Sequence, residues 1–238
     1  MASTLIKTHK ELADHIRGHR ILHLNSLGKD SIVALEWLAN YAKPAKIISV
    51  FYKFMAYHTD DDRYLSYLKK RYPAVEFVVV PSPLELTYIA GWEYQTPIFC
   101  KTEFNNWEYI KFGFDELSEE LRQKYQCSYI CSGQSKYESF ARASKFYKTG
   151  LLFKNYIYPM GLMDKKQVFS IIKQSGMKLH PQYKITNSTF DHPTYYKMKR
   201  AFLLDPEYKK RVYKIYPLLV LDEYRMEVLF GNQYKKKQ

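Results

Sequence analysis

Two kinds of apolar pattern alternate along the first 80 residues and predict strands and helices in turn. Short apolar runs rich in β-branched and aromatic residues, at 20–25, 45–54 and 75–80, predict three strands. Between them, apolar residues recur at helical spacing in 32–42 and in 60–72. Nearly continuous apolar strands separated by helices are typical of a parallel sheet that is covered on both faces.

The pattern continues less regularly in the second half of the chain. Segment 81–99 predicts turns and a short helix, 115–125 a longer helix, and 127–133 a fourth strand that leads into a polar turn with a helical continuation. Segment 151–161 reads as strand and loop. An amphipathic helix is expected at 164–176, with an acidic N-cap and a glycine at its end.

These elements predict an α/β fold with a doubly wound, mostly parallel sheet and helices on both faces. The last sixty residues look helical and rich in tyrosine. We expect a nucleotide-binding domain over 1–185 and a helical, Tyr/Lys-rich C-terminal extension over 186–238 that packs on the core.

Composition narrows the cellular setting. In 238 residues no apolar run reaches the roughly 20 residues that span a bilayer. The N-terminal stretch lacks the apolar core of a signal peptide and reads as a short polar helix, so a cytoplasmic protein without a membrane partner is expected. The cysteines, Cys100, Cys127 and Cys131, cannot all pair within the chain, and reduced thiols are the expectation.

The charge leaves the class of partner open. A net charge of +13 with 23 tyrosines suits a nucleic-acid partner, because cations neutralise phosphates and rings stack on bases. A polyanionic small ligand also suits a basic protein, the KKKQ tail is explained as a solvated end, and tyrosines in helices commonly pack against each other. A protein partner or a second copy of the chain also stays open.

One turn carries a more specific signal. SLGKDS, residues 26–31, joins the first strand to the first long helix, so its backbone N–H groups would meet the positive end of the helix dipole, where an anion is favoured. Gly28 permits a close backbone approach, Ser26 and Ser31 add hydroxyl donors, and Lys29 adds a cation. The spacing is not that of a Walker loop. Helix capping alone is the alternative explanation of Asp30 and Ser31.

This turn resembles the S-G-G-K-D-S pyrophosphate loop (PP-loop) of the N-type ATP pyrophosphatases, also called adenine nucleotide alpha hydrolases. Leu27 stands where that family has its first glycine. Two further stretches resemble the branch with phosphoadenosine phosphosulfate (PAPS) reductase and the small subunit of ATP sulfurylase. In SGQSKYESFAR the matching positions are Gly133, Glu138, Ser139 and Arg142, with Ser135 in place of an arginine. In YPMGLMDKKQVFSIIKQSGMKLHPQY they are Tyr158, Pro159, Asp164, Val168, His180, Pro181 and Tyr183.

The resemblance covers roughly residues 18–185 and implies a nucleotide at the carboxyl ends of the strands, as the order of elements also suggests. It implies a phosphate-binding set of Ser26, Leu27, Gly28, Lys29, Asp30, Ser31, Gly133, Glu138, Ser139 and Arg142. Lys29, Asp30 and Arg142 would carry the chemistry. Asp30 would hold Mg²⁺, and Glu138 would orient Arg142 or assist the metal. A simple i,i+4 ion pair between Glu138 and Arg142 is the alternative.

The sequence departs from the reductases in its thiols. Those enzymes use a cysteine in a C-terminal E-C-G-L-H motif, whereas no cysteine follows Cys131 here, so thiol-dependent PAPS reduction is rejected unless another cysteine substitutes. Cys127 and Cys131 would share a strand face by parity, but without a C-x-x-C pair an iron–sulfur cluster is not expected. Lys53 stands near the point where the family commonly ends its second strand with aspartate.

Two acidic or histidine-containing stretches are weaker candidates for a site. HTDDD, residues 58–62, could suggest a metal cluster, but acidic residues at a helix start complement the helix dipole, which is the interpretation we favour. His180 either shapes a substrate loop or is structural.

Three functions follow as hypotheses. The first is an ATP-using adenylyltransferase that joins AMP to an acceptor oxygen and releases pyrophosphate, with sulfate, a carboxylate or a modified base as acceptor. The second is a non-catalytic subunit that binds an adenine nucleotide or sulfonucleotide. The third is a component of nucleic-acid modification that binds through the basic C-terminal region.

Overall fold

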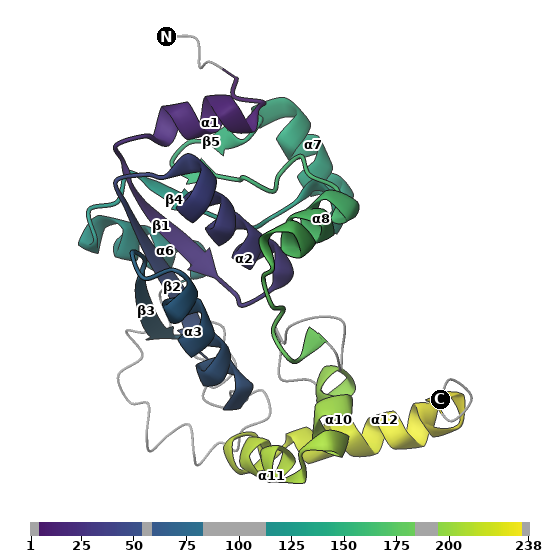
Figure 1. The fold of residues 1–238 in the computed structure, drawn as a ribbon. Coiled ribbons are helices and arrows are strands. Elements are labelled where there is room, and N and C mark those ends of the chain that lie inside the picture. The colour runs from purple at the N-terminus through teal and green to yellow at the C-terminus, as the bar shows by residue number, and fades with distance from the viewer. Residues whose placement is uncertain (1–4, 54–58, 83–112, 184–194, 235–238) are drawn as a thin grey trace. The chain divides into compact units, whose positions relative to one another are not determined.

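The computed structural model describes residues 5–53, 59–82, 113–183 and 195–234 (Figure 1). The chain forms two compact units. The first consists of Met1–Tyr52, Asp61–Val80 and Asp115–His180, and the second of Lys53–Asp60, Pro81–Phe114 and Pro181–Gln238. The predicted division at residue 185 stays a prediction. Among the helices of the described residues, none is long and apolar enough to cross a membrane.

The first half of the chain follows the predicted alternation closely. Its elements are α1 (His9–Ile16), β1 (Arg20–Asn25), α2 (Lys29–Glu36), η1 (Trp37–Ala42), β2 (Lys46–Lys53), α3 (Thr59–Arg71) and β3 (Glu76–Pro81). The long helix begins three residues earlier than its apolar spacing predicted, at Lys29, and it changes to a π-helix at Trp37. Helix α1 is less polar than expected, because Leu12, Ala13 and Ile16 are buried.

The second half supplies the remaining strands. Its elements are α6 (Phe114–Lys124), β4 (Tyr129–Cys131), η3 (Lys136–Glu138), α7 (Phe140–Thr149), β5 (Leu152–Phe153), β6 (Tyr156–Ile157) and α8 (Lys165–Ser175). The segment predicted as strand and loop is a short antiparallel pair, β5 and β6. Helix α8 has the predicted caps, a capping box from Asp164 to Gln167 and Gly176 in the left-handed conformation. Most of 81–99 lies outside the described residues.

The strands form one six-stranded sheet in the order β3-β2-β1-β4-β6-β5. Strand β1 pairs in parallel with β2 and β4, and β4 pairs in parallel with β6. The chain therefore runs outward from β1 to β3 and then returns to the other side of β1 with β4. The doubly wound, mostly parallel α/β sheet is confirmed.

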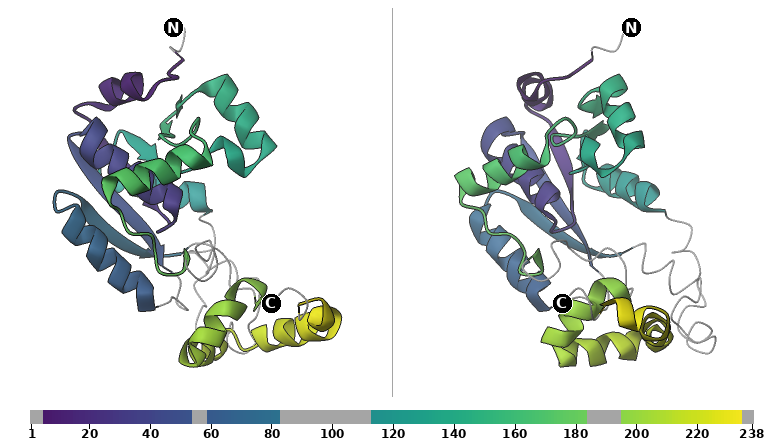
Figure 2. Two further views of the ribbon diagram at one scale, coloured as in Figure 1. Left: turned by 45° about the vertical axis from the view of Figure 1, so that its right-hand side comes forward. Right: turned by 90° about the vertical axis from the view of Figure 1, so that its right-hand side faces the viewer.

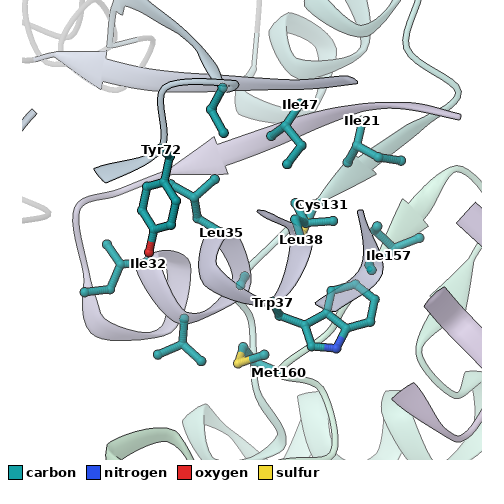
Figure 3. Packing of buried hydrophobic residues seen from close by; sticks show 14 of the residues in the cluster. Ile21, Ile32, Leu35, Trp37, Leu38, Ile47, Tyr72, Cys131, Ile157 and Met160 are labelled. Carbon is teal, nitrogen blue, oxygen red and sulfur yellow. The ribbon is translucent and has the colours of Figure 1, made fainter. Parts of the chain in front are cut away.

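Each face of the sheet has its own core. On one face, Ile21 and Ile47 pack toward α2 and η1, in a cluster that also takes side chains from α1, α3 and α8 (Figure 3). On the other face, Leu22 and Ile48 pack with Leu121 of α6. Helices α2 and α8 lie side by side over the first face (Figures 1 and 2). This arrangement brings the start of α2 near the start of α8.

Three helices among the described residues of the second unit have a small core of their own. They are α10 (Tyr195–Leu204), α11 (Pro206–Ile215) and α12 (Leu219–Tyr234). Tyr208 and Tyr216 are buried in that core with Phe202. For these two tyrosines, the explanation by helix packing is confirmed, whereas Tyr224 is exposed.

Candidate functional site

The loop between β1 and α2 is held by a chain of buried hydrogen bonds. His23 Nε2 lies 2.9 Å from the Ser31 carbonyl oxygen, and Nδ1 lies 3.0 Å from Ser49 Oγ. A carbonyl only accepts, so Nε2 carries the proton and Ser49 donates to Nδ1. Asn25 Nδ2 in turn donates to Ser49 Oγ at 3.1 Å, and Asn25 Oδ1 accepts the Leu27 N–H at 2.9 Å. The chain ties two strands to the loop and to the first turn of α2.

His23 is neutral at pH 7 in this chain of bonds. Burial lowers its pKa to about 4, although the hydrogen bond to the Ser31 carbonyl acts in the opposite direction. Sequence reasoning missed His23, Asn25 and Ser49. A signal was present, because His23 and Asn25 are polar residues two apart in an otherwise apolar strand.

Leu27 adopts the left-handed conformation, with φ of 57°. Glycine reaches this region without steric cost, whereas a bulky residue there is strained. The departure from the family's first glycine therefore falls on the residue of the loop that needs a left-handed backbone. The side chain of Leu27 is buried in the main core, which offsets part of that strain.

Gly28 is the N-cap of α2 and offers the first turn no side-chain hydrogen bond. Lys29, Asp30 and Ser31 are therefore the first three helical residues. Ser31 Oγ donates to the Gly28 carbonyl at 2.9 Å. Neither Asp30 nor Ser31 is the N-cap itself, because both follow Gly28, and Asp30 is the acidic residue of the first turn. The first-turn N–H groups retain the character of an anion site.

Gly133 permits strand β4 to end close to this helix. A Cβ on Gly133 would lie 2.7 Å from the Ser31 nitrogen and 2.8 Å from the Asp30 carbonyl carbon. Both contacts are with backbone atoms, which cannot rotate away. The glycine of the second motif is therefore needed to bring the segment after β4 against the loop between β1 and α2.

A pocket of about 250 Å³ lies where the three sequence motifs meet. Its lining residues, all in the first unit, are Lys29, Asp30, Ser135, Tyr137, Glu138, Met163, Asp164, Lys165 and Val168. The Lys29 ammonium pairs with the Asp30 carboxylate, and both side chains are only 18% exposed. Lys165, at the first turn of α8, is a second pocket cation that sequence reasoning missed.

The position of this pocket follows from the topology. The strand order reverses between β1 and β4, and parallel sheets bind ligands at the carboxyl ends of strands at such a switch point. Lys29 and Asp30 follow β1, and Ser135 and Glu138 follow β4. The fold therefore places both motifs at the edge where a ligand is expected.

Several predicted site residues support this pocket without lining it. They are Ser26, Leu27, Gly28, Ser31, Gly133, Ser139 and Arg142. The Arg142 guanidinium pairs with Glu138, as the ion-pair alternative expected. Ser139 is the N-cap of α7, and its hydroxyl accepts the Arg142 N–H at 3.2 Å. Glu138 thus links Arg142 to the pocket.

The prediction that Cys127 and Cys131 share a strand face is wrong. Cys131 packs with Ile21 and Ile157 on one face of the sheet, whereas Cys127 packs with Leu22 on the other. The parity argument fails because β4 spans only Tyr129–Cys131, so Cys127 precedes the strand. Burial raises the pKa of both thiols. Cys100 lies outside the described residues.

The two weaker candidates lie together, away from the lining of the pocket. Asp61 stands in the first turn of α3, as the dipole interpretation requires, and its Oδ1 lies 3.0 Å from Nε2 of the buried His180. The Tyr64 ring meets His180 edge-on, with centroids 5.0 Å apart. These contacts join α3 to the segment after α8.

A magnesium ion in this pocket would need a bound nucleotide to supply part of its ligands. Within the described residues no group of three His, Cys, Asp or Glu side chains forms a metal site. Mg²⁺, however, commonly takes one or two carboxylates and completes its shell with substrate phosphates and water. Each of the three pocket carboxylates already has a partner, since Asp30 pairs with Lys29, Glu138 pairs with Arg142 and Asp164 caps α8.

No protein-family profile and no curated sequence matches the chain. Several solved structures resemble the chain at low sequence identity. The U34-tRNA thiolase NcsA from Methanococcus maripaludis with its 4Fe–4S cluster has 15% identity and a TM-score of 0.48, covering 92% of this chain and 78% of that one.

Two others are similar to about the same degree. PAPS reductase from Candida auris, in a phosphate complex, has 13% identity and a TM-score of 0.46, covering 74% of this chain and 82% of that one. The NH3-dependent NAD synthetase from Campylobacter jejuni, in complex with nitrate, has 14% identity and a TM-score of 0.46, covering 97% and 95%. Similarity at this level does not extend to activity or substrate.

Proposed function

We propose that this protein is a PP-loop adenylyltransferase, which transfers AMP from ATP to an acceptor oxygen and releases pyrophosphate. The proposal rests on one observation, the pocket that Lys29 and Asp30 line together with Ser135, Glu138 and Lys165. Two cations beside a helix N-terminus at the switch point of a parallel sheet suit the polyphosphate of a nucleotide.

In the proposed reaction, the acceptor oxygen attacks the α-phosphorus of ATP. A bond forms between that oxygen and phosphorus, while the bond to the oxygen bridging the α- and β-phosphates breaks, and pyrophosphate leaves with the electron pair. Negative charge develops on the leaving group. Lys29 and the first-turn amides of α2 would neutralise it, and Gly28 would permit the close approach. The hydroxyls of Ser26 and Ser31 would contribute only after they turn away from their hydrogen bonds within the loop.

Other groups of the pocket hold the reactants. Mg²⁺ on Asp30, when bound, would neutralise the phosphate oxygens. Lys165 and Arg142, the latter held by Glu138, would meet the nucleotide or an anionic acceptor. To contact a ligand directly, the Arg142 side chain must rotate away from Glu138. While the pair stays intact, Arg142 acts on the pocket only by holding Glu138 in position.

The test is exchange of labelled pyrophosphate into ATP, with Mg²⁺ and a panel of acceptors. Lys29→Ala and Asp30→Asn should each lower the exchange rate by roughly a hundredfold, as loss of a transition-state donor does. Lys70→Ala is the matched control, because Lys70 is exposed on α3 and does not line the pocket. Circular dichroism checks that each variant is folded.

Two results would contradict the catalytic assignment. Exchange that is unaffected by both substitutions would show that the pocket is not the site. ATP binding without pyrophosphate release for any acceptor would instead support a non-catalytic nucleotide-binding subunit.

A further inference from the structure

The outer surface of η3 and α7 carries three exposed aromatic rings. Tyr137 is 58% exposed, Phe140 96% and Tyr147 65%. Residues 140 and 147 are seven apart in α7 and lie on one helix face, and Tyr137 precedes them by one short turn. Single exposed rings are common, but three along one face form an apolar strip of a kind that marks binding sites. These three residues are called the aromatic stripe below.

Positive charge is interleaved with the stripe. Lys136 Nζ lies 5.3 Å from the centroid of the Tyr137 ring and 5.9 Å from that of Tyr147, so one ammonium gathers two of the rings. Lys148 is exposed beside Tyr147. From Gln134 to Tyr158 the sequence has the cations Lys136, Arg142, Lys145, Lys148 and Lys154 and the single carboxylate Glu138.

The charge on this surface is basic even after internal pairing. Glu138 pairs with Arg142, which leaves the lysines without a matching carboxylate in the same segment. Burial, and then the neighbouring charge of Arg142, lower the pKa of Lys145, which lies over the Tyr158 ring, so the positive charge beside the stripe comes from Lys136 and Lys148. The stripe therefore presents apolar rings in a positive field.

The stripe also begins at the candidate site. Tyr137 lines the same pocket as Lys29 and Lys165. Helix α7 lies at the edge of the first unit in the views of Figures 1 and 2. A polymer that followed the stripe would thus have one end at the pocket and the rest on an open helix face.

We propose that the outer face of η3 and α7 binds single-stranded nucleic acid, with bases stacked on the aromatic stripe and phosphates on Lys136 and Lys148. Stacking on protein rings combined with backbone cations is the usual mode of single-strand binding. Duplex bases offer no free faces to such rings. The cores of protein interfaces are instead depleted in lysine, which favours a nucleic acid over a protein at this surface.

The role of the bound strand as the acceptor substrate rests on the proposed function. If the pocket adenylylates an acceptor oxygen, the acceptor would be carried on the bound strand, a substrate class that the adenylyltransferase assignment leaves open. Binding of the strand itself depends only on the stripe. The two can therefore fail separately.

The first experiment measures fluorescence anisotropy of labelled single-stranded RNA and DNA of about 12 nucleotides, within the usual site size, with the full chain at low salt. Phe140→Ala and Tyr147→Ala should each weaken binding roughly tenfold, in line with the loss of one stacked base. Phe140→Tyr should restore it. Tyr224→Ala is the matched control, because Tyr224 is 67% exposed on α12, outside the stripe.

The second experiment measures the salt dependence of the same affinity. Lys148→Ala should reduce the slope of log K against log salt by about 0.7, the value for one phosphate contact on a single strand. Lys70→Ala on α3 should leave the slope unchanged. A higher affinity for RNA than for DNA of equal length would show that the ribose 2′-hydroxyl is also contacted. Equal affinities would show that binding depends on the bases and phosphates alone.

Several outcomes would overturn the proposal. One is that neither single-stranded RNA nor single-stranded DNA binds at low salt. Another is that Tyr224→Ala loses as much affinity as Phe140→Ala. The proposal would also fail if light scattering showed that the wild type is an oligomer, that Phe140→Ala dissociates it, and that neither protein binds nucleic acid. The stripe would then be a protein interface. Lys29→Ala should keep strand binding while it lowers pyrophosphate exchange roughly a hundredfold. Normal exchange in both Lys29→Ala and Asp30→Asn would overturn the proposed function and leave strand binding standing.

Discussion

Leu27 makes two opposing contributions to the stability of the phosphate loop. Its left-handed backbone costs roughly 1–2 kcal/mol for a residue with a Cβ. Its side chain is only 2% exposed and contributes the favourable free energy of burial. A glycine would remove the strain and the packing together, whereas an alanine would remove most of the packing and keep the strain.

These contributions can be separated with two substitutions. Leu27→Ala should lower the free energy of unfolding by roughly 2–5 kcal/mol, as for other buried leucines. Leu27→Gly should be about 1 kcal/mol more stable than Leu27→Ala, because the glycine relieves the left-handed strain. At most positions a glycine variant is less stable than the alanine variant, so this order would be the reverse of the usual one. Urea unfolding measures both, and a glycine variant less stable than the alanine variant would refute the strain argument.

His23 makes stability depend on pH in a definite direction. Burial lowers its pKa in the folded state to about 4, below the value of 6.5 expected for the unfolded chain. Between these two values the unfolded chain binds more protons, so the free energy of unfolding rises with pH. The contribution is fully present above pH 6.5 and is lost as pH falls toward 4, by roughly 3 kcal/mol at most.

The measurement is urea unfolding of the wild type and of His23→Gln across this pH range. Glutamine does not titrate, so the difference in stability between the two proteins should shrink as pH falls from 6.5 to 4. Carboxylates such as Glu119, whose pKa is lowered chiefly by hydrogen bonding to Arg122, affect both proteins alike and cancel in the difference. A difference that stays constant with pH would contradict a buried neutral histidine.

Among the elements, apolar periodicity predicted the bounds of the core strands well, whereas the short strands occupy only part of the segments predicted for them. Strand β1 spans the predicted residues 20–25, since its burial is nearly continuous. Strand β4 is only three residues long, and the β5–β6 pair is shorter still. Their positions depend on pairing with strands distant in sequence, which the local pattern does not contain.

The candidate site shows the same limit. The motifs with Lys29 and Glu138 were identified from local sequence, and the strand order accounts for their convergence. The contact between His23 and Ser49 could not be predicted, because it follows from the register in which His23 lies opposite Ser49 on β2. Lys165 was missed, although it lies within the third quoted stretch, because it joins the pocket only through the packing of α8 on α2.

Gly133 tests the packing between β4 and α2. Gly133→Ala should displace the first turn of α2, because the new Cβ would lie 2.7–2.8 Å from backbone atoms of Asp30 and Ser31. We expect unfolding to become easier by roughly 1–3 kcal/mol, a typical cost of overpacking. ATP affinity, measured by calorimetry, should fall by about tenfold or more.

The matched control is Gly176→Ala at the end of α8. Gly176 has φ of 64° and open space around its Cβ position, so alanine there should cost about 1 kcal/mol of stability through backbone strain alone. ATP affinity should stay unchanged. Wild-type ATP binding in Gly133→Ala would show that the close approach of β4 to α2 is not needed for the site.

At the scale of the whole molecule, the chain has separate hydrophobic cores in its two units. The pocket draws all of its lining residues from the first unit. The helices α10, α11 and α12 pack around Tyr208, Tyr216 and a few smaller side chains. A core this small stabilises little on its own, so loss of one large side chain should have a large local effect.

Tyr216→Ala should therefore loosen the C-terminal helices and leave the nucleotide pocket intact. Tyr216 is fully buried, and truncation of a buried aromatic residue costs roughly 3–5 kcal/mol. Limited proteolysis with mass spectrometry should show new cleavage within α10–α12, while ATP affinity by calorimetry stays at the wild-type value. Tyr224→Ala, which removes an exposed tyrosine from α12, should change neither measurement. If ATP affinity fell together with protease resistance in Tyr216→Ala, nucleotide binding would depend on the C-terminal helices, and the pocket of the first unit would be only part of the site.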